Sequence, residues 1–220
     1  MLRVGLAIAV AGIVVQGVAH ATNVLAFDSR YFSLDASAEG NAFAWASTMA
    51  TFAAACGAAV LGLLDARNRT LALALATLLL FLSLDDFVEI HEKFGERVGE
   101  RLDLPDAIGV RIWVALYLPL LALVALALWR LARDMPERIR RYLALGLVLL
   151  VAGVLSEGLG VITKKLEEEG VETPHRLRSG LEEALELGGW ILLAAALFAA
   201  VYAVLEREAP VSDTAPSRSP

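Results

Sequence analysis

The stretch LALALATLLLFLSLDDFVEIHEKFG, residues 71–95, decides the class of this protein, because a fully apolar segment runs into closely spaced acids without a turn signal. Its apolar part, Leu71–Leu84, is 14 residues long. A helix of that length rises only ~21 Å, whereas the hydrocarbon core of a bilayer is ~30 Å thick. We therefore expect Asp85 and Asp86 to lie within the depth of a membrane, where ionisable side chains usually serve a function.

The rest of the chain has the same apolar character. Hydrophobic residues occupy 58% of the 220 positions, which is more than a soluble domain usually carries. Six apolar segments approach the ~20 residues that a spanning helix needs; they cover residues 4–27, 42–64, 71–90, 112–131, 142–163 and 187–205. None shows the alternation of a membrane β-barrel. The sequence predicts an all-α polytopic membrane bundle of six transmembrane helices over residues 1–206, followed by a disordered Pro/Ser-rich tail over residues 207–220.

The first apolar segment has two interpretations. Its basic start and the small residues of AHA before Thr22 are typical of a cleaved signal peptide. The apolar run is longer than such a peptide needs and continues through NVLAF. We favour a retained helix, and both interpretations put residue 28 on the same side of the membrane.

Charge is distributed unequally between the two sides that six alternating helices define. One side holds 10 of the 19 basic and 6 of the 25 acidic residues, a net +4, and the other side holds the remainder, a net −10. The compact basic loops DARNRT and RLARDMPERIRR are typical of the cytoplasmic side. We therefore expect a bacterial inner-membrane protein with both termini in the cytoplasm. The formal charge of −6 and the lack of a basic patch argue against a nucleic-acid partner.

Ionisable groups from four segments fall at similar heights. Counted at 1.5 Å per residue from the basic side, Asp86 and Glu157 lie ~22 Å up, His20 ~24 Å up and Glu186 ~28 Å up. All three histidines, including His91, fall toward the acidic side. These groups therefore share one slab of the predicted membrane.

Helical geometry adds direction to height. If the helix continues past residue 90, Asp85, Glu89 and Glu92 share one stripe, whereas His91 points largely away. On the last segment, the pair Thr173-Pro174 predicts a helix start well before the membrane. That start would place Glu182 and Glu186 on one stripe.

Converging carboxylates repel one another and require protons, basic partners or a cation. Mixed Asp, Glu and His sets suit zinc, manganese or iron, and helical bundles build metal sites from such inward-facing groups. The candidate metal ligands are Asp85, Asp86, Glu89, Glu157, Glu186, His20 and His91, with Asp86 and Glu157 as the candidate catalytic pair. No HExxH motif is present, since Gly95 stands where the second histidine would be. The alternative is that the later acids lie on a solvated helix and the deeper ones form buried ion pairs.

Two segments carry a resemblance. YFSLDASAEGNAFAW, residues 31–45, and LSLDDFVEIHE, residues 82–92, resemble a group of bacterial polytopic membrane proteins with a "SLD-acid…HE" helix. The resemblance covers about the first 95 residues and implies no particular activity. It implies the signature positions Asp35, Glu39, Trp45, Asp85, Asp86, His91 and Glu92.

Four functions remain open at this point. The first is a divalent-metal-dependent membrane enzyme that acts on a lipid-like substrate. The second is a proton- or cation-coupled transporter or channel component. The third is a haem protein with His20 and His91 as axial ligands, and the fourth is a non-catalytic membrane subunit. The lipid bilayer and a cation are the expected partners, and a protein partner or homo-oligomer is left open.

Overall fold

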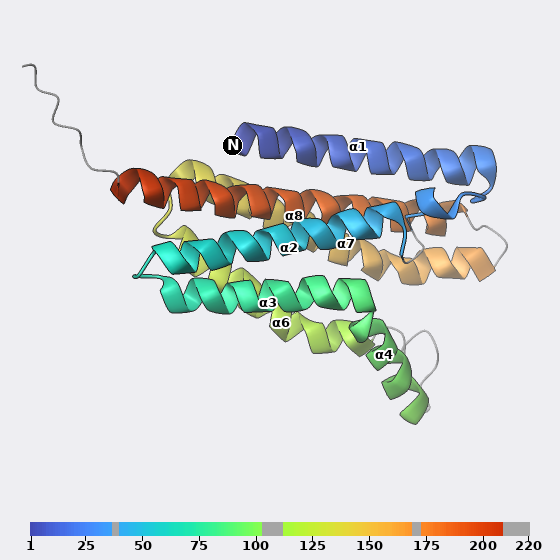
Figure 1. The fold of residues 1–220 in the computed structure, drawn as a ribbon. Coiled ribbons are helices and arrows are strands. Elements are labelled where there is room, and N and C mark those ends of the chain that lie inside the picture. The colour runs from blue at the N-terminus through green and yellow to red at the C-terminus, as the bar shows by residue number, and fades with distance from the viewer. Residues whose placement is uncertain (37–39, 103–111, 169–172, 209–220) are drawn as a thin grey trace, which may run out of the picture.

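The computed structural model describes residues 1–36, 40–102, 112–168 and 173–208, and all their regular structure is helical. The described elements, in chain order, are α1 (Leu2–Phe27), the short 3-10 helix η1 (Phe32–Leu34), α2 (Ala42–Leu64), α3 (Arg69–Val88), α4 (Ile90–Arg101), α6 (Ile112–Ala132), α7 (Glu137–Glu168) and α8 (Thr173–Glu208) (Figure 1). Every long helix except α4 follows the axis of one elongated bundle.

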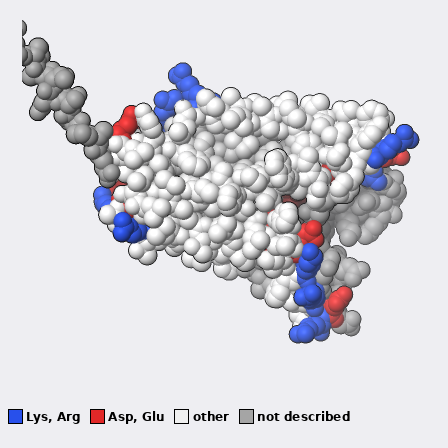
Figure 2. All heavy atoms as spheres, in the orientation of Figure 1, with Lys and Arg blue, Asp and Glu red and all other residues white. Residues whose placement is uncertain are grey.

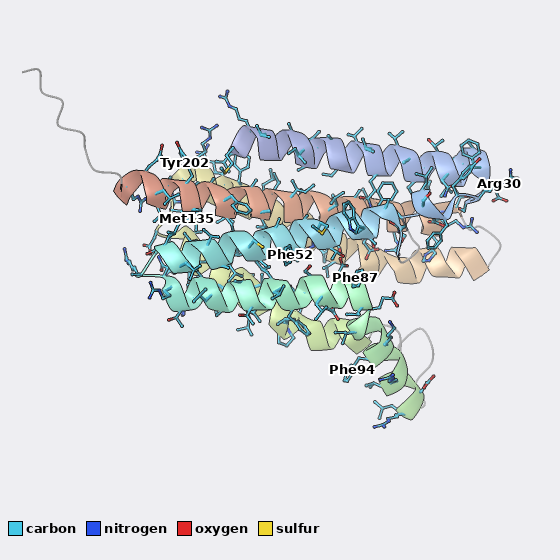
Figure 3. The ribbon with its side chains drawn as sticks, viewed as in Figure 1. Arg30, Phe52, Phe87, Phe94, Met135 and Tyr202 are labelled. Atoms are coloured by element: carbon cyan, nitrogen blue, oxygen red, sulfur yellow. The ribbon has the colours of Figure 1, made fainter. Side chains whose placement is uncertain are left out.

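Helix α8 is the centre of the bundle. It packs along α1, α2 and α7, while α2 also packs along α3 (Figure 1). Helix α6 contacts α3 and, less extensively, α7. We call "basic end" the end where α1 begins, where α8 ends, and where the α2–α3 and α6–α7 turns lie. Met135 and Tyr202 mark this end in Figure 3, and Arg30 marks the opposite one.

The helices have the dimensions and surface of membrane spans. Five of them (α1, α2, α3, α7 and α8) contain stretches long and apolar enough to cross a bilayer. Helix α6 is 21 residues long, and its segment Leu118–Ala132 is apolar. On the face drawn in Figure 2, charged residues gather at the ends and on α4, and a broad uncharged band lies between them. The expected helical membrane architecture is thus supported, while six as the number of spans stays a prediction.

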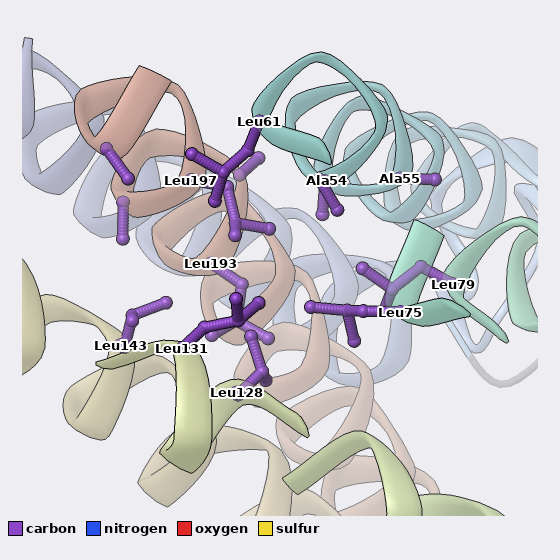
Figure 4. Packing of buried hydrophobic residues seen from close by; sticks show 14 of the residues in the cluster. Ala54, Ala55, Leu61, Leu75, Leu79, Leu128, Leu131, Leu143, Leu193 and Leu197 are labelled. Carbon is purple, nitrogen blue, oxygen red and sulfur yellow. The ribbon is translucent and has the colours of Figure 1, made fainter. Parts of the chain in front are cut away.

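Small residues let α8 approach its neighbours closely. A Cβ atom at Gly5 of α1 would lie 2.3 Å from the Cβ of Ala195, and one at Gly146 of α7 would lie 3.0 Å from the carbonyl oxygen of Gly189. Helix association in a bilayer depends on such van der Waals contact, because lipid tails are as apolar as the side chains. Toward the basic end, buried leucines such as Leu193 fill the space between α2, α3, α6 and α8 (Figure 4).

The end of α3 differs from the sequence prediction, whereas the start of α8 agrees with it. The helix expected to continue past residue 90 instead ends at Val88, because Glu89 adopts the left-handed conformation (φ 56°, ψ 42°). Helix α4 then leaves the bundle axis (Figure 1). The predicted stripe that continues from Asp85 through Glu89 to Glu92 is therefore wrong. The predicted early start of the last helix is confirmed, since α8 begins at Thr173 and is 36 residues long.

Residues 207–220 were predicted to form a tail. Arg207 and Glu208 belong to α8, and residues 209–220 lie outside the described residues.

Candidate functional site

Buried polar side chains occupy one half of the bundle. Each lies in the half of its helix that is farther from the basic end, or just before that helix; they are Gln16, His20, Asn23, Asn41, Ser47, Thr51, Ser83, Asp85 and Ser156. We call this region the polar half. Because a buried polar group is costly unless it is hydrogen-bonded, such segregation indicates a dedicated polar interior.

His20 holds three segments together. Its Nε2 donates to the carbonyl oxygen of Arg176 at 2.8 Å, and its Nδ1 accepts from the backbone N–H of Ala36 at 2.9 Å. This network assigns the neutral tautomer with the proton on Nε2. The ring is 2% exposed and lies so close to Gly180 that a Cβ there would be 2.1 Å from His20 Cδ2.

Both ring nitrogens of His20 are therefore committed to the backbone. A metal ligand needs a free nitrogen lone pair, so ligation by His20 would require the hydrogen bond from Ala36 or the one to Arg176 to break. The carboxylate of Asp35 lies 3.5 Å from Nδ1. This geometry favours a structural role for His20, as the joint between α1, α8 and the α1–α2 loop.

Two asparagines fix the same loop. Asn23 exchanges two hydrogen bonds of 3.0 Å with the backbone of Tyr31. Asn41 caps α2 by accepting from the N–H groups of Phe43 and Ala44, and it donates to the carbonyl oxygen of Asp35 at 2.8 Å. The described part of the α1–α2 loop is thus held over the polar half by side chains buried beneath it.

The two aspartates at the end of α3 are both removed from water, one buried and the other half-buried. Asp85 is 4% exposed, and its depth in a membrane stays a prediction. The Oδ2 atom of Asp86 accepts a hydrogen bond of 2.5 Å from the Thr48 hydroxyl, and Ser83 Oγ donates to the carbonyl oxygen of Thr48 at 3.0 Å. A hydrogen bond to a charged group contributes about 1.5–3 kcal/mol, so the Thr48 contact fixes Asp86 on the α2 side of α3.

The carboxylates of α8 lie against α7. A Cβ at Gly153 would lie 2.9 Å from Glu186 Cγ, so this glycine leaves room for the Glu186 side chain. One turn earlier, Arg178 forms an ion pair with Glu182, and each side chain is 13% exposed. Arg178 Nη1 also donates to the carbonyl oxygen of Ser156 at 3.1 Å. The pair is therefore part of the α7–α8 contact rather than a solvated surface pair.

The remaining predicted ligands have different outcomes. Glu89 lies at the break between α3 and α4 and forms an ion pair of 3.2 Å with Lys93. The side chains of Glu157 and His91 lie outside the described residues, although α7 and α4 include these positions. Among the side chains that the structure describes, no three of the His, Cys, Asp and Glu type lie close enough together to hold a metal ion.

Gln16 is a buried polar residue that was not among the site residues predicted from the sequence. It is 1% exposed, and neither of its amide atoms has a hydrogen-bond partner among the described residues. Ser156 Oγ and Arg178 Nε are buried without a partner in the same way. Buried groups of this kind usually bind internal water. The available signal was the position of Gln16 inside an apolar run, four residues before His20.

Comparison with known protein families gives a match. A family described as "Domain of unknown function (DUF8692)" matches residues 1–201, which is most of the chain. No curated protein and no solved structure matches the sequence.

Proposed function

We propose that this chain, which belongs to the DUF8692 family, is a polytopic membrane protein whose polar half binds a divalent cation. The activity that we infer for it is that of a metal-dependent membrane enzyme acting on a lipid-like substrate. The carboxylates of Asp85 and Asp86 would bind the metal, with Glu157 contributed by α7. Glu186 of α8 would have to move to join them, since no three of the described acidic or histidine side chains lie close enough to share a metal.

The burial of Asp85, at a position that the sequence predicts to lie at membrane depth, supports this proposal most directly. A carboxylate in that position, beside a second one bound to Thr48, is expensive in a bilayer and normally faces a functional interior. Further buried polar groups on α1, α2 and α7 lie in the same half of the bundle. A cation would balance several carboxylates at once, and it would use the buried oxygens of Asp85 and the half-buried ones of Asp86.

The donor set guides the choice of metal. Zinc, manganese and iron were expected from a mixed Asp, Glu and His set. With both nitrogens of His20 committed to the backbone, the described ligands are oxygens, which favour Mg²⁺ or Mn²⁺. Zinc or iron would need a nitrogen from His91. The metal would activate a water molecule or polarise an ester-like bond, and the depth of the site favours a substrate that partitions into the membrane.

Metal content tests the proposal. The detergent-purified protein is analysed for bound metal beside the double variant Asp86→Asn, Glu157→Gln. A matched control, Asp134→Asn with Glu137→Gln, removes two carboxylates from the basic end, where they pair with Arg67 and Arg141. We expect about one metal per chain in the wild type and the control, and little in the site variant. Equal metal in all three, or none in the wild type, would contradict the proposal.

A second function has its own supporting observation. The amide of Gln16, with Ser156 Oγ and Arg178 Nε, is buried without a hydrogen-bond partner among the described residues, and such groups usually bind internal water. Water beside buried carboxylates suits a proton- or cation-coupled transporter or channel component. Uptake into proteoliposomes that Gln16→Leu abolishes, with no tightly bound metal, would favour this function over the enzyme.

We also propose that the basic end lies in the cytoplasm of a bacterial inner membrane. The segments DARNRT and RLARDMPERIRR, which contain its two short turns, hold seven arginines and three acids, as is typical of cytoplasmic loops. A reporter enzyme active only outside the cytoplasm, fused after residue 135, should be inactive, and the same reporter fused after residue 102 should be active. The reverse pattern would invert the topology.

A further inference from the structure

A groove runs between α6 and α7 at the basic end. It encloses about 250 Å³ and has mostly apolar walls. Its main lining residues are Leu128, Trp129, Leu143 and Leu147, with Arg133 and Arg140 at its rim. Leu128 and Leu143 are buried and form the floor, whereas Trp129 is 53% exposed.

The groove lies where two weakly joined helices meet the membrane surface. Helix α7 packs extensively against α8 but makes only a small contact with α6. Leu147 lies seven residues along α7 from Arg140, a rise of ~10 Å toward the middle of the bundle. The apolar part of the groove therefore lies at hydrocarbon depth and its rim at headgroup depth.

Within the described part of the chain, the arginines at the rim are not engaged by acids. No salt bridge links Arg133 or Arg140 to a carboxylate among the residues that the structure describes, whereas nearby Arg67 and Arg141 are paired with Asp134 and Glu137. The guanidinium of Arg133 stacks over the Trp129 ring at 3.7 Å from its centroid. This contact orients the guanidinium and leaves its edge N–H groups to donate to a ligand.

We propose that this groove binds one anionic phospholipid. The phosphate would accept hydrogen bonds from Arg133 and Arg140, and one acyl chain would lie against Leu128, Leu143 and Leu147. Basic pockets between transmembrane helices recognise anionic headgroups in this way, and arginine binds phosphate oxygens in a bidentate manner. The proposal depends on membrane insertion and not on the cation site of the polar half.

Native mass spectrometry of the full chain in detergent tests the lipid site. The protein is titrated with phosphatidylglycerol and with phosphatidylcholine of the same acyl chains. We expect tighter binding of phosphatidylglycerol, and a loss of this preference of about tenfold or more in Arg133→Gln, Arg140→Gln. The matched control, Arg69→Gln with Arg138→Gln, removes two charges from the same end outside the groove and should keep the preference within about twofold.

A second variant tests the apolar part of the groove without changing charge. Ala144 lines the groove and is exposed, so Ala144→Trp should fill the groove, leave the fold intact and abolish the first tight lipid adduct. Equal binding of both lipids to the wild type would overturn the proposal, and so would an equal loss in the arginine control. A change of oligomeric mass in Ala144→Trp, without a change in lipid binding, would make the groove a protein interface and overturn it as well.

Discussion

The packing of Gly180 against His20 gives a sharp test of the fold around the polar half. In Gly180→Ala, the new Cβ would lie 2.1 Å from Cδ2 of His20 and 2.8 Å from both Cγ and Nε2. The ring cannot move aside freely, because the Ala36 N–H and the Arg176 carbonyl hold it from two directions. The substitution must therefore either separate α1 from α8 or break these hydrogen bonds.

The expected magnitude follows from those two alternatives. Overpacking a tight contact costs about 1–3 kcal/mol, and leaving one buried hydrogen-bonding group unpaired costs about 1–3 kcal/mol. We expect Gly180→Ala to lower the free energy of unfolding by about 2–4 kcal/mol. The measurement is reversible unfolding of the detergent-solubilised protein by a denaturing detergent, followed by circular dichroism.

Gly17 provides the matched control. It lies on α1 one turn before His20, and a Cβ there would meet nothing within 4 Å. Gly17→Ala should be neutral or stabilise by up to about 1 kcal/mol, since alanine favours a helix. In a double-mutant cycle, Gly180→Ala should cost little free energy of unfolding when it is made in the His20→Ala background, because the ring that it clashes with is absent. Equal stability of Gly180→Ala and Gly17→Ala would refute the packing described for His20.

Three further substitutions test other parts of the structure by the same unfolding assay. Asn41→Ala removes the cap of α2 and should destabilise by about 1–2 kcal/mol; no change would mean that the cap is not formed. Thr48→Val removes the hydrogen bond to Asp86 and should cost about 1–3 kcal/mol, whereas Thr77→Val, at an exposed position on α3, should cost less than about 0.5 kcal/mol. Glu89→Gly should be neutral or stabilising by up to about 1 kcal/mol, because glycine adopts the left-handed conformation without strain. A marked loss of stability would show that the ion pair with Lys93 contributes more free energy than the left-handed backbone of Glu89 costs.

The long helices and the burial of a polar group near the end of α3 were predictable from the sequence. The apolar segment before Asp85 is too short to cross a bilayer alone, which led to the expectation that Asp85 avoids water, and the side chain is 4% exposed. The start of α8 was predictable because Thr173 and Pro174 are local signals. These predictions use only spacing along one helix.

Other features depend on partners far away in the chain. The role of His20 is decided by Ala36 and by Arg176, which is 156 residues away, and no local pattern indicates that pairing. The helix break at Glu89 carries no glycine or asparagine, the residues that commonly adopt the left-handed conformation. The sequence therefore predicted which helices are long better than the direction of their side chains, and the membrane depth of the site stays a prediction.

Titration of the metal-free protein with Mn²⁺, with free Mn²⁺ followed by electron paramagnetic resonance, tests the central claim most directly. The account predicts that each wild-type chain binds about one Mn²⁺ ion, seen as a fall in the signal of free Mn²⁺. The double variant Asp85→Asn, Asp86→Asn, with unchanged helix content, should bind none. The same Mn²⁺ uptake by the folded double variant, or no uptake by the wild type, would contradict a cation site in the polar half.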